Sequence, residues 1–133
     1  MKKHIGKILY CVILLFSLLR IASILFVSFP QAGDVTIHSS IDSTDVTQPL
    51  SGSDAAAVKA IFRWKIYDVF GDGAGCPFGK QLTVTIGDKV FALAQDGCHV
   101  VMDAQSQKIF FLSKDEWLRI YNIFKSYDAT IPK

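Results

Sequence analysis

Residues 8–29 read ILYCVILLFSLLRIASILFVSF, a run of 22 residues that contains a single charge, Arg20. A helix of this length spans the hydrocarbon core of a bilayer, which is about 30 Å thick. Arg20 lies near the middle of the run and costs about 2.5 to 3.5 kcal/mol on insertion scales. The fifteen Leu, Ile, Val and Phe residues outweigh that cost, so the sequence predicts a membrane segment.

The charges on either side of this segment predict its orientation. Three lysines within residues 1–7 precede it and Asp34 follows it, so the positive-inside rule places residues 1–7 in the cytoplasm. Residues 8–29 are then a single-pass signal-anchor in the lipid bilayer of the inner (cytoplasmic) membrane, with the rest of the chain outside. The alternative is a cleaved signal peptide and a secreted or periplasmic domain, although no A-x-A cleavage pattern follows the apolar run.

Residues 30–53 are predicted to be a polar tether, because DVTIHSSIDSTDVTQPLSGS holds too few large apolar side chains to order itself. A short strand over residues 35–37 is the alternative. Beyond residue 33 the chain carries ten Lys or Arg against twelve Asp or Glu. This faintly acidic balance lacks the basic surface that holds a nucleic-acid backbone, so no nucleic-acid partner is expected.

Residues 54–133 are predicted to form one extracytoplasmic α+β domain. QLTVTI and KVFALAQ, joined by Gly-Asp, are typical of a β-hairpin. In the register that places all apolar residues on one face, Val84 pairs with Phe91 and Leu82 with Leu93. Residues 98–102 and 108–112 read as two more strands, which gives a small, mostly antiparallel, four-stranded sheet.

Two helices are predicted to flank this sheet. A short N-terminal helix begins near Asp54, before AAAVKAIF. Ser113 followed by Glu116 forms a capping box, and the apolar stripe of a C-terminal amphipathic helix is formed by Trp117, Ile120, Tyr121 and Phe124. We expect this stripe to pack on the sheet.

The stretch GDGAGCPFGK, residues 71–80, does not match a nucleotide-binding or calcium-binding loop. A Walker loop needs glycine where Ala74 stands and Ser or Thr where Gln81 stands, and a calcium loop needs a bidentate Glu where Gly79 stands. No cofactor, nucleotide or metal is therefore expected.

A disulfide at Cys76 explains residues 71–80 better. Projected outward, the hairpin register brings Cys76 nearly opposite Cys98, and an oxidising compartment would join them in a disulfide. A zinc site of Cys76, Cys98 and His99 is the weaker alternative, because adjacent strand residues face opposite ways.

DGAGCPFG, AQDGCHVV and SKDEWLRIYNIFKSY resemble small exported bacterial domains in which an early Gly-Cys, a later Asp-Gly-Cys and a closing capped helix recur. The resemblance covers about the last eighty residues. It implies an exported α+β module with paired cysteines and assigns no functional residue.

These features predict a membrane-anchored, extracytoplasmic binding or inhibitory module of the bacterial cell envelope that is not an enzyme. Its partner would be an envelope protein, contacted by the aromatic side chains of Trp64, Tyr67, Phe70 and Phe78. Arg20 is a candidate contact inside the membrane.

The alternative activity is a small envelope hydrolase. The chain has one Glu, and His99 is the general base this reading would need, with Ser106, Ser113 or Ser126 as nucleophile. None of these serines lies in a nucleophile-elbow motif.

Overall fold

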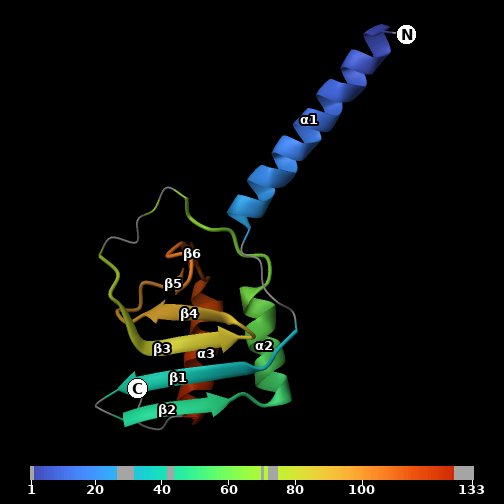
Figure 1. The fold of residues 1–133 in the computed structure, drawn as a ribbon. Helices are drawn as coiled ribbons and strands as arrows, with labels where there is room; N and C mark the ends of the chain where they lie inside the picture. The colour runs from blue at the N-terminus through green and yellow to red at the C-terminus, as the bar shows by residue number, and fades with distance from the viewer. Residues whose placement is uncertain (1, 27–31, 42–43, 70, 72–74, 128–133) are drawn as a thin grey trace.

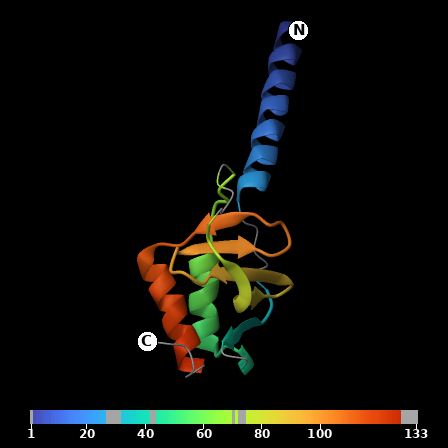
Figure 2. The same ribbon diagram turned by 90° about the vertical axis from the view of Figure 1, so that its left-hand side faces the viewer.

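The computed structural model describes residues 2–26, 32–41, 44–69, 71 and 75–127 (Figures 1 and 2). An N-terminal helix stands apart from an α+β domain in which two helices cover one face of an antiparallel sheet (Figure 2). The elements are α1 Lys2–Leu25, β1 Val35–Ile41, β2 Thr44–Pro49, α2 Gly52–Phe62, β3 Phe78–Ile86, β4 Lys89–Ala94, β5 Val100–Asp103, β6 Ile109–Phe111 and α3 Lys114–Tyr127.

The α+β prediction is confirmed, but the four-stranded sheet is wrong. Within the described residues the sheet has six strands in the order β2-β1-β3-β4-β5-β6, with every neighbouring pair antiparallel. The two additional strands come from the segment that was predicted to be a polar tether, where the alternative of a strand at residues 35–37 was nearer the truth.

Strand β1 is stabilised by its place beside β3. Its residues pair with β3 from Val35 opposite Ile86 to Ser39 opposite Leu82. Val35, Ile37 and Ser39 are almost fully buried, at 2%, 3% and 2% exposure, and the residues between them lie on the other face. Alternate residues of β1 therefore supply the side chains that pack in the core. The polar residues between them lie on the other face and do not prevent the strand from forming.

The predicted hairpin register is confirmed near its turn and wrong farther out. Ile86 pairs with Lys89, and Val84 pairs with Phe91. An irregularity between Phe78 and Thr83 then shifts the register, so that Phe78 lies opposite Ala94. The predicted pairing of Leu82 with Leu93 is not kept, because the chain in β3 gains residues relative to β4 at this point.

The core lies between the sheet and helix α2. The ring of Phe62 on α2 lies 5.0 Å from the ring of Phe91 on β4 and 5.8 Å from that of Phe110 on β6, measured between centroids. Helix α2 starts two residues earlier than predicted and buries Ala57, Val58 and Ile61 beside Phe62.

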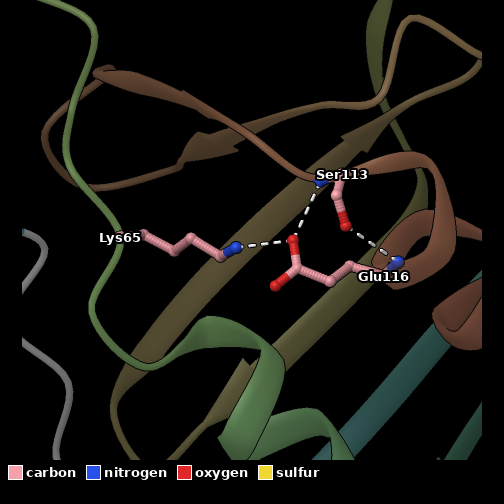
Figure 3. A network of polar contacts seen from close by, with 3 residues as sticks. All are labelled: Lys65, Ser113 and Glu116. Carbon is pink, nitrogen blue, oxygen red and sulfur yellow. Dashed lines mark hydrogen bonds and ion pairs between the residues drawn. The ribbon is translucent and has the colours of Figure 1, made fainter.

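Helix α3 confirms the predicted capping box. The Ser113 N–H donates to Glu116 Oε2 over 2.9 Å, and the Glu116 N–H donates to Ser113 Oγ over 3.3 Å (Figure 3). Lys65 Nζ also contacts Glu116 Oε2, at 2.6 Å, and so ties the segment after α2 to the start of α3. The expected burial of the apolar stripe is confirmed for Trp117, Ile120 and Phe124. Ile123 is buried with them, whereas the predicted Tyr121 is only partly buried against the core.

Helix α1 is long and apolar enough over Gly6–Leu25 to cross a bilayer, and a signal sequence would have the same features. It ends four residues before the predicted segment does, at Leu25, and residues 27–29 lie outside the described part of the chain. Arg20 therefore lies five residues from the end of the helix. If α1 spans a bilayer, the Arg20 side chain can reach the interface from that position rather than stay at the bilayer centre.

Candidate functional site

The face of the sheet opposite α2 and α3 carries a groove of about 490 Å³, which we call the sheet groove. Thr83, Ala92 and Met102 lie side by side across β3, β4 and β5, because Thr83 pairs with Ala92 and Ala92 pairs with Met102. The groove is lined by these three together with His38, Phe78, Gly79, Val90, Ala104 and Gln107. An open, mostly apolar concavity of this size is a typical binding site.

His38 forms one wall of the sheet groove and is held in place by β2. Its Nδ1 lies 2.9 Å from Thr47 Oγ1, and its Nε2 lies 3.1 Å from Asp45 Oδ1. Both ring nitrogens therefore have partners. This second histidine of the domain was missed at the sequence level, because the segment that carries it was assigned to the tether.

Phe78 is half-buried at one end of the sheet groove. It packs with Cys76 and Met102 against a small cluster of Ala94, Val100 and Ile109. Of Trp64, Tyr67 and Phe78, the three described residues among those predicted to contact a partner, Phe78 is the one that lines the groove.

The other predicted contact residues are placed differently. Trp64 is 77% exposed and lies in the turn after α2. Tyr67 is buried, and its hydroxyl donates to Asp103 Oδ2 over 2.6 Å, so its ring is part of the core rather than a contact surface. Phe70 lies outside the described residues.

The hydrogen bond between Tyr67 and Asp103 shifts the pKa values of both residues, and this pair was not predicted. Burial and the hydrogen bond to Asp103 raise the pKa of Tyr67 to about 12. Burial acts to raise the pKa of Asp103 as well, but hydrogen bonds from Tyr67 and from the N–H groups of Gln105 and Ser106 outweigh it and hold that pKa below its usual value. Asp103 thus orders the β5–β6 turn.

A second cluster joins Cys76, Asp96 and Cys98. The two sulfurs and a carboxylate oxygen of Asp96 all lie within 4.8 Å of one another, and the thiols are free. The predicted proximity is therefore present, although the disulfide is not.

The predicted reason for this proximity is wrong, because the projected register fails at the irregularity in β3. A hydrogen bond of 3.2 Å from the Gln95 N–H to the Pro77 carbonyl instead joins the two segments. The turn after β4 is closed by the Cys98 N–H, which donates to Asp96 Oδ1 over 3.1 Å.

Asp96 also controls the charge of the neighbouring thiol. The hydrogen bond from Cys98 holds the pKa of Asp96 below its usual value. The same bond, together with Cys76, raises the pKa of Cys98 from its ordinary value of 9.0 to about 12, so the thiol stays protonated in mildly alkaline solution as well as at neutral pH. A protonated thiol is a poor nucleophile.

This cluster supports two kinds of chemistry. The two sulfurs need a small rearrangement to reach the bond length of a disulfide, about 2.05 Å. Two thiolates and a carboxylate could instead hold a soft divalent cation with one position open. His99 is not part of the cluster, since its ring packs 5.5 Å from that of Trp117.

The serines considered for a hydrolase serve local structure. Ser113 Oγ caps α3, Ser126 Oγ donates to the Ile123 carbonyl, and Ser106 Oγ accepts from the Lys108 N–H. His99, the proposed base, lies beside Trp117 in a left-handed backbone conformation with φ 56°.

A scan against protein-family models and searches of curated proteins and of solved structures each found no match to this chain. The resemblance to small exported domains therefore stays a prediction from sequence motifs.

Proposed function

We propose that this chain is a membrane-anchored binding or inhibitory module of the bacterial cell envelope, and that it works without catalysis. Helix α1 is the anchor, and the domain lies outside the cytoplasmic membrane. The observation that carries the binding role is the sheet groove, an apolar concavity on the face that α2 and α3 leave open.

The proposed ligand is an apolar segment of another envelope protein. Helix α1 leaves the domain near β6, at one edge of the sheet (Figures 1 and 2). When α1 spans the membrane, the face that carries the groove points sideways along the bilayer surface. Proteins in the same membrane or the adjoining space can reach a site with this orientation.

The hydrolase alternative has less support. The three candidate serines hydrogen-bond to nearby backbone groups, and His38 is held by Thr47 and Asp45. These positions favour a binding surface with fixed walls over a site that exchanges protons.

The thiol cluster is proposed to stabilise the domain as a disulfide. Oxidation of Cys76 and Cys98 forms one S–S bond and transfers two electrons and two protons to a disulfide-bearing oxidant of the envelope. The loop that the bond would close contributes about 3 kcal/mol in the chain-entropy model.

Two matched substitutions test the groove. Val90 lines it, whereas Thr85, its cross-strand partner, does not. We expect Val90→Glu to abolish photo-crosslinking to an envelope protein from a reactive residue placed at Gln107, and Thr85→Glu to leave the same crosslink intact. Equal crosslinking in both variants would contradict binding in the groove.

A separate labelling experiment tests the topology. Gln48 is exposed on β2, so Gln48→Cys offers a thiol to a membrane-impermeant maleimide in intact cells with a permeable outer layer. Labelling before the inner membrane is opened is the expected result. Labelling only after it is opened would place the domain in the cytoplasm.

A further inference from the structure

Large apolar side chains are exposed around the end of α1. Trp64, Ile66 and Val69 are 77%, 55% and 47% exposed, and Phe26, directly after α1, is 42% exposed. Scattered apolar residues are normal on a surface, but adjacent ones mark an interaction site. The segment that carries Trp64 and Ile66 passes beside the end of α1 in both views (Figures 1 and 2).

This segment is joined directly to the helix. The Tyr67 N–H donates to the Leu25 carbonyl over 2.8 Å, and Phe26 and Ile66 form an antiparallel bridge. Lys108 Nζ lies 3.5 Å from the Ile24 carbonyl, where a cation suits the end of a helix. The depth of Leu25 in a membrane therefore fixes the depth of residues 66–67.

The same segment is also fixed to the domain, through alternate residues. Lys65 Nζ contacts Glu116 Oε2 at 2.6 Å, and Tyr67 donates to Asp103 over 2.6 Å (Figure 3 shows the Lys65 contact). Successive side chains of an extended chain point in opposite directions, so Ile66 is turned outward. Its exposure follows from this geometry.

The conformation and exposure of Trp64 are unfavourable for the isolated domain. Its backbone is left-handed, with φ 63°, which is unfavourable for a residue other than glycine. Its indole is the most exposed of the large apolar side chains in the described residues. Neither feature stabilises the domain, which points to a contact outside the chain.

We infer that Phe26, Trp64, Ile66 and Val69 form a membrane-interface surface that inserts into the head-group region and holds the domain against the bilayer. The inference rests on the anchor in the proposed function. The 20 residues of Gly6–Leu25 span about 30 Å as a helix, equal to the hydrocarbon thickness. The Leu25 carbonyl then lies at the hydrocarbon boundary, and Trp64 lies at the level where tryptophan is enriched.

The basic residues near this surface suit an anionic membrane. Arg63 is exposed next to Trp64, and Lys108 lies at the end of α1. Cations at this depth attract anionic head groups. The lipid that fits the surface is therefore a bilayer with anionic phospholipid, such as phosphatidylglycerol.

Tryptophan fluorescence of the full chain in vesicles tests the inference. The chain has two tryptophans, and Trp117 is buried, so wild-type emission minus that of Trp64→Phe reports Trp64. The vesicles contain phosphatidylcholine and phosphatidylglycerol, with bromine on the lipid tails near the head group. We expect brominated lipid to quench Trp64, and aqueous iodide to quench it weakly.

A matched control places the indole far from α1. Gln48 lies on β2, the sheet edge opposite β6, so the double variant Trp64→Phe/Gln48→Trp should respond to iodide and not to bromine. If vesicle-bound wild-type Trp64 behaves like this control, the interface surface is excluded while the anchor stands. If the chain fails to float with the vesicles, the anchor and the inference both fail.

Discussion

The hydroxyl of Tyr67 donates a 2.6 Å hydrogen bond to the Asp103 carboxylate, which is 1% exposed. The bond joins the segment beside α1 to the turn between β5 and β6. The same carboxylate accepts from the N–H groups of Gln105 and Ser106, at 2.9 and 3.3 Å. One buried carboxylate therefore orders a turn and holds the segment whose Tyr67 N–H donates to the Leu25 carbonyl at the end of α1.

Removing the hydroxyl should destabilise the domain measurably. Hydrogen bonds to charged groups contribute about 1.5–3 kcal/mol, so Tyr67→Phe is expected to lower the free energy of unfolding by that amount in urea titrations. A double-mutant cycle with Asp103→Asn isolates the pair. The two effects should fall short of additivity by more than about 0.5 kcal/mol. Simple additivity would show that the hydroxyl and the carboxylate do not interact.

The Glu116 carboxylate should make stability fall in acid. Burial acts to raise its pKa, but hydrogen bonds from Lys65 and Ser113 outweigh this and hold the pKa below the ordinary value of 4.5. The unfolded chain then takes up the proton first as the pH falls. The contribution of Glu116 is therefore complete above pH 4.5 and is lost as the pH falls through its folded pKa.

Glu116→Gln isolates the charge from the cap, because Gln can also accept from the Ser113 N–H. We expect the substitution to cost about 1 kcal/mol at pH 7. The difference from wild type should shrink below pH 4.5, measured by urea unfolding across pH. The exposed neighbour Asp115→Asn is the control and should change little. A pH-independent gap between Glu116→Gln and wild type would refute the ion pair with Lys65.

The elements with local signals could be predicted from sequence, and those that depend on distant partners could not. The β3–β4 turn and the Ser113–Glu116 cap use residues close in sequence, and both form as predicted. Strand β1 has three large apolar residues, Val35, Ile37 and Ile41, among polar ones, and it is stabilised by pairing with β3, more than forty residues away. The residues near β1 in the sequence do not indicate that β3 is available to pair with it.

The candidate site was predicted only in part, for similar reasons. Cys76 and Cys98 lie close together as expected, but the projected register is broken in β3 and the Gln95–Pro77 hydrogen bond joins their segments instead. The sheet groove was missed because it is built from residues such as Thr83 and Ala92, which are ordinary in any strand. Their significance lies in the absence of a helix over that face in the described chain.

Strand β1 should be essential for folding, in contrast to a tether. Ile37 is 3% exposed, so Ile37→Ala should lower the free energy of unfolding by about 2–5 kcal/mol. Gln48→Ala on the exposed edge strand β2 should cost less than about 0.5 kcal/mol. Equal, small effects of both substitutions in thermal or urea unfolding would contradict a structural role for β1 and would favour the predicted tether.

The cysteine pair should be oxidised in chain isolated from its host. Intact mass after alkylation without reductant should show Cys11 modified and Cys76 and Cys98 protected, with the chain lighter by two hydrogens. Reduction should then lower stability by about 3 kcal/mol, and Cys98→Ser should leave Cys76 open to alkylation. Alkylation of both thiols in the isolated wild-type chain would contradict the disulfide, and a retained zinc ion in native mass would assign the cluster to metal.

The Asp96 carboxylate should suppress the reactivity of Cys98 in the reduced chain. The thiol donates to it, and this bond is the main cause that raises the pKa of Cys98 to about 12. Asp96→Asn removes the negative charge while keeping a similar shape, so the pKa of Cys98 should fall toward its ordinary value of 9.0 and more thiolate should be present at pH 8. Alkylation of Cys98, followed by peptide mass, should accelerate in Asp96→Asn. Asp88→Asn, in the exposed β3–β4 turn, should not change the rate. An unchanged alkylation rate in Asp96→Asn would mean that Asp96 does not hold the proton on Cys98. The hydrogen bond to Asp96 would then be no obstacle to oxidation of the cysteine pair.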